Sequence, residues 1–252
     1  ATGPNGCITT DSVSVAIDTI PPDVNATGDT LDCAAVGVTL IGSSLTPGAN
    51  FLWTGPGGLN TTNPAPVVSV IGVYTLAVTG PNGCTADTTA EVVADDDAPA
   101  VSIASPVAIT CGQPQTTLSV TSGSIGVQYV WNGPGGLVFT DSSFTTSLPG
   151  LYTLVATAPN GCTVMATETV VLDTFTPVLQ ATGDALSCSK PSGVLTGSSG
   201  TPGTVLNWNG PNGFAASGNT ALISLPGLYT LTGTAPNGCT AQMPVVVGAD
   251  VA

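Results

Sequence analysis

The stretch that decides the fold is Gly72-Val73-Tyr74-Thr75-Leu76-Ala77-Val78-Thr79-Gly80-Pro81-Asn82-Gly83-Cys84-Thr85. Val73 to Val78 predict a β-strand, because β-branched, aromatic and apolar residues dominate the run. Gly80 to Gly83 predict a reversal, since proline presets φ and Asn-Gly tolerates positive φ. Thr85 to Val93 then resemble a second strand. The stretch therefore predicts a β-hairpin with a cysteine directly after its turn.

This hairpin recurs along the chain of 252 residues. Its Pro-Asn-Gly-Cys turn ends at four cysteines spaced 77, 78 and 77 residues apart, namely Cys7, Cys84, Cys162 and Cys239. Ten residues before the last three stands a tyrosine: Tyr74, Tyr152 or Tyr229. A fixed period of this length is the signature of tandem repeats, each one a small structural unit.

A second set of cysteines lies 51 residues before three of these: Cys33, Cys111 and Cys188. A tryptophan follows each of them by 20 residues, at Trp53, Trp131 and Trp208. We expect the tryptophans and the tyrosines to anchor the cores, although exposed tryptophans could instead form a sugar-binding platform. The spacing predicts one disulfide in each repeat, joining Cys33 to Cys84, Cys111 to Cys162 and Cys188 to Cys239.

Within one repeat, Val36, Val38 and Leu40 alternate as one face of a strand, and further strands are expected at 51–53, 67–71, 73–78 and 85–93. Short strands, frequent turns and a Cys-Trp-Cys order are typical of an immunoglobulin-like β-sandwich. We therefore predict an all-β fold of three such domains, at 22–97, 98–175 and 176–252. In so small a domain, a bridge closing about 50 residues would contribute roughly 4 kcal/mol.

Residues 1–21 correspond to the last turn and strand of a preceding repeat. Cys7 is then unpaired because its partner would lie before Ala1. Alternatively, this strand inserts into a neighbouring subunit, or Cys7 forms a bridge to another chain.

The composition excludes several classes of function. The chain has one cation, Lys190, against 15 carboxylates, a net charge of -14, and it lacks the clustered Lys and Arg that bind nucleic acid. It has no histidine and no arginine, so a Ser or Cys nucleophile would have no imidazole base. Paired carboxylates could cleave glycosides, but here they recur at the repeat edges. We expect no enzymatic activity.

We expect no membrane-spanning segment, because no apolar run approaches about 18 residues. Oxidised cysteines indicate an extracellular or cell-surface location.

The order Cys, Trp, Gly-x-Tyr-Thr-Leu and Asn-Gly-Cys-Thr resembles the repeats of giant bacterial surface adhesins of the gliding-motility type, and it is similar to polycystic-kidney-disease-like (PKD-like) sandwich modules. The resemblance covers all three repeats and the leading fragment. It implies tandem cell-surface modules that act by spacing, adhesion or assembly. The Gly-Pro-Gly-Gly after the tryptophan and the scarcity of cations depart from that family.

The same resemblance implies O-glycosylation at Asp-Ser or Asp-Thr tripeptides, with chance matches as the rival explanation in a Thr-rich chain. The acceptors would be Ser12, Thr19, Thr30 and Thr88.

An aspartate follows each hairpin cysteine by 11 residues, as Asp18, Asp95, Asp173 or Asp250, and marks the junctions between repeats. No cofactor is expected except calcium at the cluster of Asp95, Asp96 and Asp97, because hard oxygen ligands suit this ion. The alternative is a solvated acidic linker.

Two functions remain. The first is a structural shaft of a filament, sheath or adhesin, whose partners are further repeats or copies of itself. The second is an adhesive module that binds a surface glycan or protein through its loops.

Overall fold

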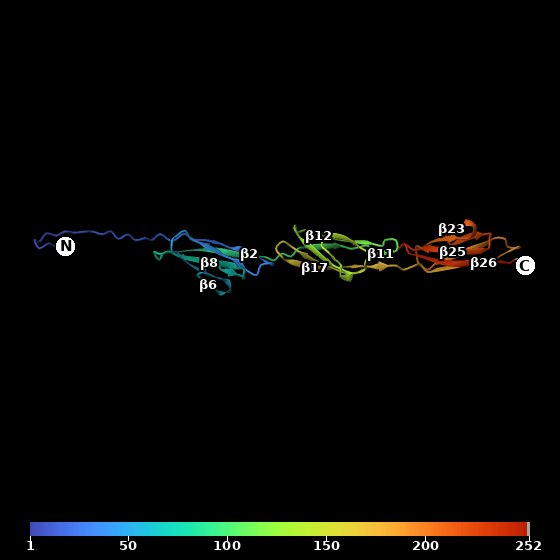
Figure 1. Ribbon diagram of the computed structural model, residues 1–252, viewed down its shortest axis with the longest axis horizontal. Helices are drawn as coiled ribbons and strands as arrows, with labels where there is room; N and C mark the ends of the chain where they lie inside the picture. The colour runs from blue at the N-terminus through green and yellow to red at the C-terminus, as the bar shows by residue number, and fades with distance from the viewer. Residues whose placement is uncertain (251–252) are drawn as a thin grey trace. The chain divides into compact units, whose positions relative to one another are not determined.

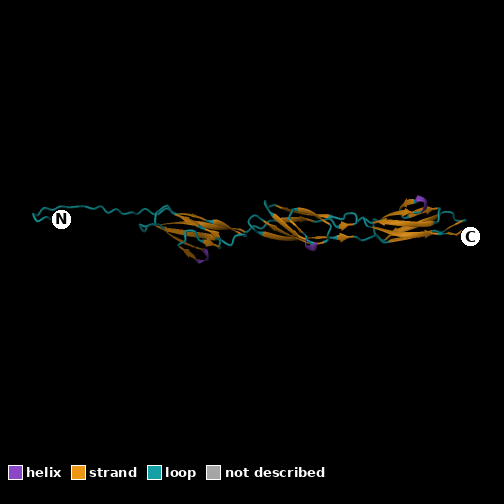
Figure 2. Cartoon of the chain, in the orientation of Figure 1, coloured by secondary structure: helices purple, strands orange, loops and turns teal. Residues whose placement is uncertain are grey.

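The computed structural model describes residues 1–250 of the chain. They form an all-β protein with three short 3₁₀ turns (Figure 2). No helix within these residues is long and apolar enough to cross a membrane. The strands group into two compact units, the first made of residues 1–98 and 159–162 and the second of residues 99–158 and 163–252.

The first unit contains one β-sandwich, drawn from blue to teal in Figure 1. Its main sheet has the order β2-β9-β8-β5-β6, and β1-β4 and β3-β7 are antiparallel pairs. The elements are β1 (Asn25–Thr27), β2 (Asp29–Asp32), β3 (Val38–Thr39), β4 (Ile41–Ser43), β5 (Asn50–Gly55), η1 (Pro56–Gly58), β6 (Leu59–Thr61), β7 (Val67–Val68), β8 (Gly72–Thr79) and β9 (Thr85–Asp95).

The second unit contains the strands of the other two repeats. The middle repeat has sheets β10-β12-β15 and β14-β13-β16-β17 with the pair β11-β18. Its elements are β10 (Val101–Ala104), β11 (Ile109–Thr110), β12 (Thr116–Ser122), β13 (Gln128–Asn132), η2 (Pro134–Gly136), β14 (Val138–Phe139), β15 (Ser143–Thr146), β16 (Gly150–Thr157), β17 (Thr163–Val170) and β18 (Leu172–Asp173).

The last repeat has the same arrangement, with sheets β19-β21-β24 and β23-β22-β25-β26 and the pair β20-β27. Its elements are β19 (Leu179–Gly183), β20 (Leu186–Ser187), β21 (Gly193–Ser199), β22 (Val205–Asn209), η3 (Pro211–Gly213), β23 (Ala215–Ser217), β24 (Thr220–Ile223), β25 (Gly227–Thr234), β26 (Thr240–Val247) and β27 (Ala249–Asp250).

The immunoglobulin-like sandwich predicted from the sequence is the fold that the structure shows. The hairpin of β8 and β9 pairs in register from Gly72 opposite Val92 to Thr79 opposite Thr85. The strand expected to include Val36, Val38 and Leu40 begins later than the sequence indicated. Strand structure starts at Val38, and Val36 is 95% exposed.

Each repeat has its own hydrophobic cluster around one tryptophan and one tyrosine. Trp53, Trp131 and Trp208 are at most 1% exposed, so none of them offers a platform for a ligand. The tryptophan is on the strand preceding the 3₁₀ turn, and the tyrosine is on the adjacent strand. These two large aromatic side chains are the largest members of each core cluster.

The tyrosine hydroxyl donates a hydrogen bond to the carbonyl oxygen four residues earlier. The distances are 2.6 Å from Tyr74 to Val70, 2.9 Å from Tyr152 to Leu148 and 2.8 Å from Tyr229 to Leu225. This bond satisfies the polar end of a buried ring and fixes the chain entering the strand, as a tyrosine corner does. Burial also raises the pKa of Tyr74.

The glycine two residues after each tryptophan makes room for this tyrosine. A Cβ at Gly55, Gly133 or Gly210 would lie 2.3 to 2.4 Å from the tyrosine ring. The ring and the strand backbone therefore touch with no space for a methyl group.

We predict that Gly133→Ala destabilises the middle repeat by about 1 to 3 kcal/mol, because the methyl group overpacks Tyr152. Gly123→Ala is the matched control, since no atom lies within 4 Å of a Cβ there and the glycine needs no positive φ. Thermal unfolding followed by tryptophan fluorescence measures both. Equal melting temperatures for the two variants would contradict this packing.

Candidate functional site

The Pro-Asn-Gly-Cys turn forms a rigid hairpin tip, in which the asparagine side chain closes the turn. At the tip that contains Cys84, the Cys84 N–H donates to Asn82 Oδ1 at 3.0 Å, and Gly83 has a φ of 80°. The same bond closes the turns at Asn5, Asn160 and Asn237, at 3.0 to 3.2 Å. The glycine supplies the positive φ, and the asparagine side chain acts as an additional backbone acceptor.

The other end of the asparagine amide holds the segment that leads into the same repeat. Asn82 Nδ2 donates to the Ile20 carbonyl oxygen at 2.9 Å. Asn160 Nδ2 donates to Asp95 Oδ1 at 2.8 Å and to the Asp97 carbonyl at 3.1 Å. One side chain thus fixes both the tip and the connection between successive repeats.

The tip that contains Asn237 has the same contacts. Asn237 Nδ2 donates to Asp173 Oδ1 and to the Phe175 carbonyl, both at 3.0 Å. A buried proline follows in each connection, at Pro22, Pro99 and Pro177. Asp95 and Asp173 thus each accept a hydrogen bond from the tip of the following repeat. That the spaced aspartates and prolines mark domain boundaries stays a prediction.

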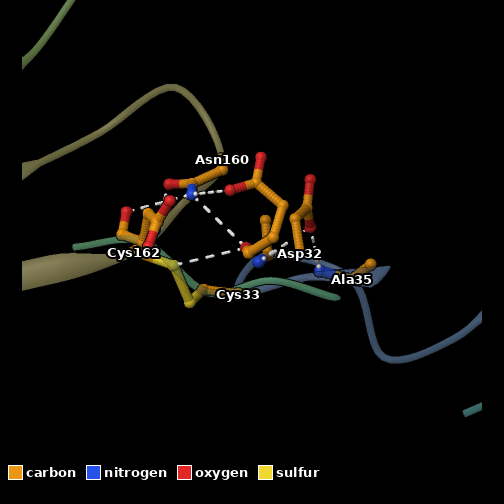
Figure 3. Close-up of a disulfide and its surroundings, with 8 residues drawn as sticks. Asp32, Cys33, Ala35, Asn160 and Cys162 are labelled. Atoms are coloured by element: carbon orange, nitrogen blue, oxygen red, sulfur yellow. Dashed lines mark hydrogen bonds between the residues drawn. A yellow bond between two sulfur atoms is a disulfide. The ribbon is translucent and has the colours of Figure 1, made fainter. Parts of the chain in front are cut away.

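The cysteine of a tip forms a disulfide with the preceding repeat. Cys162, at the tip between β16 and β17, bonds to Cys33, which directly follows β2, with their Cα atoms 5.0 Å apart (Figure 3). Residues 159–162 belong to the first unit. In the second unit, Cys239 bonds in the same way to Cys111, with a Cα separation of 4.9 Å.

The disulfide pairing predicted from the spacing is therefore wrong: Cys33 does not bond to Cys84, nor Cys111 to Cys162, nor Cys188 to Cys239. β2 pairs in parallel with the end of β9, placing Asp32 opposite Asp95. Cys84 directly precedes the other end of this 11-residue strand. At 3.3 Å per residue the two ends are about 33 Å apart, and a disulfide requires Cα atoms within about 7 Å.

The glycine of each bonded tip lies against a small residue next to the partner cysteine. A Cβ at Gly161 would be 2.6 Å from the Cβ of Ala34, and one at Gly238 would be 2.6 Å from the Cα of Gly112. The Gly112 N–H also donates to the Asn237 carbonyl oxygen at 3.0 Å. We call this arrangement the seated tip: an Asn-Gly-Cys turn on a Cys-small-residue loop, locked by a disulfide.

Three cysteines within the described residues have no partner: Cys7, Cys84 and Cys188. The tips of Cys7 and Cys84 are unseated, because nothing lies within 4 Å of a Cβ at Gly6 or Gly83. The leading residues 11–24 form no strand, and Val13, Val15 and Ile17 are more than 80% exposed. Whether this segment is a strand of a preceding repeat stays a prediction.

The acidic residues have specific roles in loops. Hydrogen bonds from the Leu45 N–H, with further ones from Thr46 and Ser44, hold the pKa of Asp23 below its usual value. A hydrogen bond from Lys190 at 2.9 Å, with one from the Val194 N–H, lowers the pKa of Asp184. Both carboxylates tie a loop to the sandwich.

No group of three or more His, Cys, Asp or Glu side chains suited to a metal ion occurs in the part of the chain described. Asp95 Oδ1 accepts the hydrogen bond from Asn160, so this member of the predicted calcium cluster serves the junction. Among the predicted glycosylation acceptors, Ser12, Thr19 and Thr30 are exposed and Thr88 is half-buried. Glycosylation stays a prediction.

We predict that Gly161→Ala weakens the Cys33–Cys162 disulfide, because the methyl group would overlap Ala34. Gly83→Ala is the matched control. Gly83 and Gly161 have almost the same positive φ, so both variants carry a similar backbone cost of about 1 kcal/mol. Only Gly161 packs against a neighbouring residue. The readout is the number of reactive thiols in a glutathione redox buffer.

With the chain kept dilute, so that copies do not cross-link, the wild-type chain and Gly83→Ala should show three thiols, and Gly161→Ala should approach five. The same count for both variants would contradict the seating of the tip.

Comparisons with known proteins give the fold. No protein-family model matches the chain, and no curated protein matches it. One similar solved structure is from a 1.5-MDa bacterial ice-binding adhesin, with 12% identity, a TM-score of 0.56, and coverage of 93% of this chain and 100% of that one. Another is from a Ca²⁺-stabilised adhesin of an Antarctic bacterium that binds ice, with 15% identity, a TM-score of 0.55, and coverage of 94% and 75%. The chain thus has the immunoglobulin-like fold found in bacterial adhesins.

Proposed function

We propose that this chain is a non-catalytic, extracellular structural protein, a section of the shaft of a surface filament, sheath or adhesin. The observation that carries this proposal is the seated tip, which joins successive repeats covalently at two junctions. A module that only presented a binding loop would gain nothing from a disulfide between repeats. In a shaft under tension, the same disulfide would protect the connection between repeats, which is the weakest point. Disulfides of this kind persist outside the reducing cytosol.

The disulfides also limit how far the shaft could stretch. The shortest covalent route from Ala1 to Ala252 crosses from Cys33 to Cys162, returns along the backbone to Cys111, and crosses to Cys239. More than half of the backbone is bypassed on this route. Unfolding under load would therefore release only a fraction of the length of the chain, a property suited to a load-bearing element.

The outer sheet faces of the second unit support side-by-side assembly. The outward-pointing residues of β13, β16 and β17 carry no charge, and neither do those of β22, β25 and β26. Val130, Val155 and Met165 form an apolar row across three paired strands, and Met165 is 68% exposed. Apolar and threonine-rich faces are cheaper to desolvate than charged ones.

We predict that electron microscopy of the native material shows filaments or sheets, and that Leu228→Lys abolishes them. Leu228 is 57% exposed and lies opposite Val246 on the outer face, so the charge should oppose packing without unfolding the repeat. Ile125→Lys, in a turn of the middle repeat, is the control. Dispersed monomers of the native material with measurable glycan affinity would favour the adhesive binding module instead.

We also propose that the junctions hold without calcium, although one structurally similar adhesin is described as Ca²⁺-stabilised. The Asp95 carboxylate already accepts a hydrogen bond from Asn160, and the Cys33–Cys162 disulfide closes the same junction.

A chelator should accordingly leave the melting temperature unchanged. The control is the same chelator with the metal restored in excess. A fall in melting temperature that added calcium reverses would show that Asp95, Asp96 and Asp97 bind the ion.

A further inference from the structure

The last repeat contains a third cysteine loop, at Cys188, which holds no hairpin tip within the described residues; we call such a loop an acceptor loop. Cys33 and Cys111 each follow a short strand and hold a tip cysteine. Cys188 directly follows β20 in the same way, and it is free and exposed. The residue after the cysteine is small in all three loops: Ala34, Gly112 and Ser189.

The register of the neighbouring strands is the same at all three loops. The residue before the cysteine pairs in parallel with the junction aspartate, as Asp32 with Asp95, Thr110 with Asp173 and Ser187 with Asp250. The loop of Cys188 therefore has the backbone setting of the two loops that hold a tip. A hollow of about 220 Å³ adjoins it, lined by Leu186, Cys188, Pro191, Ser224, Pro226 and Ala249.

The first repeat has the complementary half. The tip of Asn82, Gly83 and Cys84 is closed by the same hydrogen bond as the seated tips, and Asn82 already holds its leading segment at Ile20. Gly83 has nothing against it, whereas Gly161 and Gly238 are packed on their acceptors. The first repeat thus offers a formed tip, and the last repeat offers a formed acceptor loop.

We propose that the loop of Cys188 accepts the Asn82-Gly83-Cys84 tip of a second copy of this chain, and that a Cys188–Cys84 disulfide joins the copies head to tail. The two junctions within the chain are the direct precedent, since each shows this tip on this loop. The occupant is therefore specified by its chemistry: an Asn-Gly-Cys hairpin tip, whose glycine fits against Ser189.

Formation of this bond needs an oxidant, and a small-molecule disulfide such as oxidised glutathione is sufficient. Exchange at Cys188 gives a mixed disulfide and one glutathione thiol. The Cys84 thiolate then attacks the Cys188 sulfur, and the second glutathione leaves as a thiolate. Two protein thiols are oxidised to one disulfide, and one glutathione disulfide is reduced to two thiols.

One element must move for the tip to dock. At the two junctions within the chain, the asparagine of the tip holds the segment that contains the junction aspartate, Asp95 or Asp173. In the second copy, Asn82 holds the segment that contains Asp18, which is the equivalent residue. Its place beside β20 is occupied by the two-residue strand β27. A chain ending at Gly248 lacks β27 and should therefore cross-link faster than the full chain.

The test is non-reducing electrophoresis of the purified chain at high concentration in a glutathione redox buffer. We expect a ladder of multimers that a reductant collapses. Cys188→Ser and Cys84→Ser should each abolish it, while Cys7→Ser, the matched control at the other unseated tip, should leave it intact. The chain ending at Gly248 should form the ladder sooner.

The proposal is overturned if full and shortened chains both stay monomeric. It is also overturned if the ladder survives Cys188→Ser or disappears with Cys7→Ser. These results are separable from the proposed function: a chain that forms filaments by electron microscopy yet gives no ladder keeps the structural role and loses the head-to-tail bond.

Discussion

The contact on which the rest of this structure depends is the seating of an Asn-Gly-Cys tip on the cysteine loop of the preceding repeat. A small sandwich buries only a modest fraction of its surface, so its folding and its junctions need additional restraint. The seated tip supplies it through one disulfide, one asparagine amide and one glycine contact. At Cys162 and Cys239, the turn of the hairpin therefore also fastens the junction.

This arrangement explains why the motif contains these residue types. The asparagine closes the turn with its oxygen and holds the incoming segment with its nitrogen, and an ionised aspartate has no such donor. The glycine is required twice, for its positive φ and for its contact with a small residue. The cysteine is then placed close to its partner, as at Cys162 and Cys33.

Much of the fold could be predicted from the sequence because it depends on local patterns. The β-branched, aromatic and apolar residues of Val73 to Val78 indicated the strand, Pro-Asn-Gly indicated the turn, and the fixed offset of Trp53 from Cys33 identified a core anchor. The disulfide pairing could not be obtained in this way. In a tandem repeat, two cysteine spacings recur with equal regularity. Cysteines within one repeat are 51 residues apart, and a cysteine is 128 or 129 residues from its partner in the next repeat. Only the parallel pairing of β2 with the far end of β9, a long-range contact, distinguishes them.

The most direct test of the account is disulfide mapping of the alkylated, unreduced chain after cleavage before aspartate. Cleavage gives fragments 32–86, 97–140, 141–172 and 184–249, which contain all the cysteines of the three repeats. The structure predicts that 32–86 is linked to 141–172, and 97–140 to 184–249. A link between 97–140 and 141–172, with 32–86 closed on itself, would show bridges within repeats and contradict the seated tip.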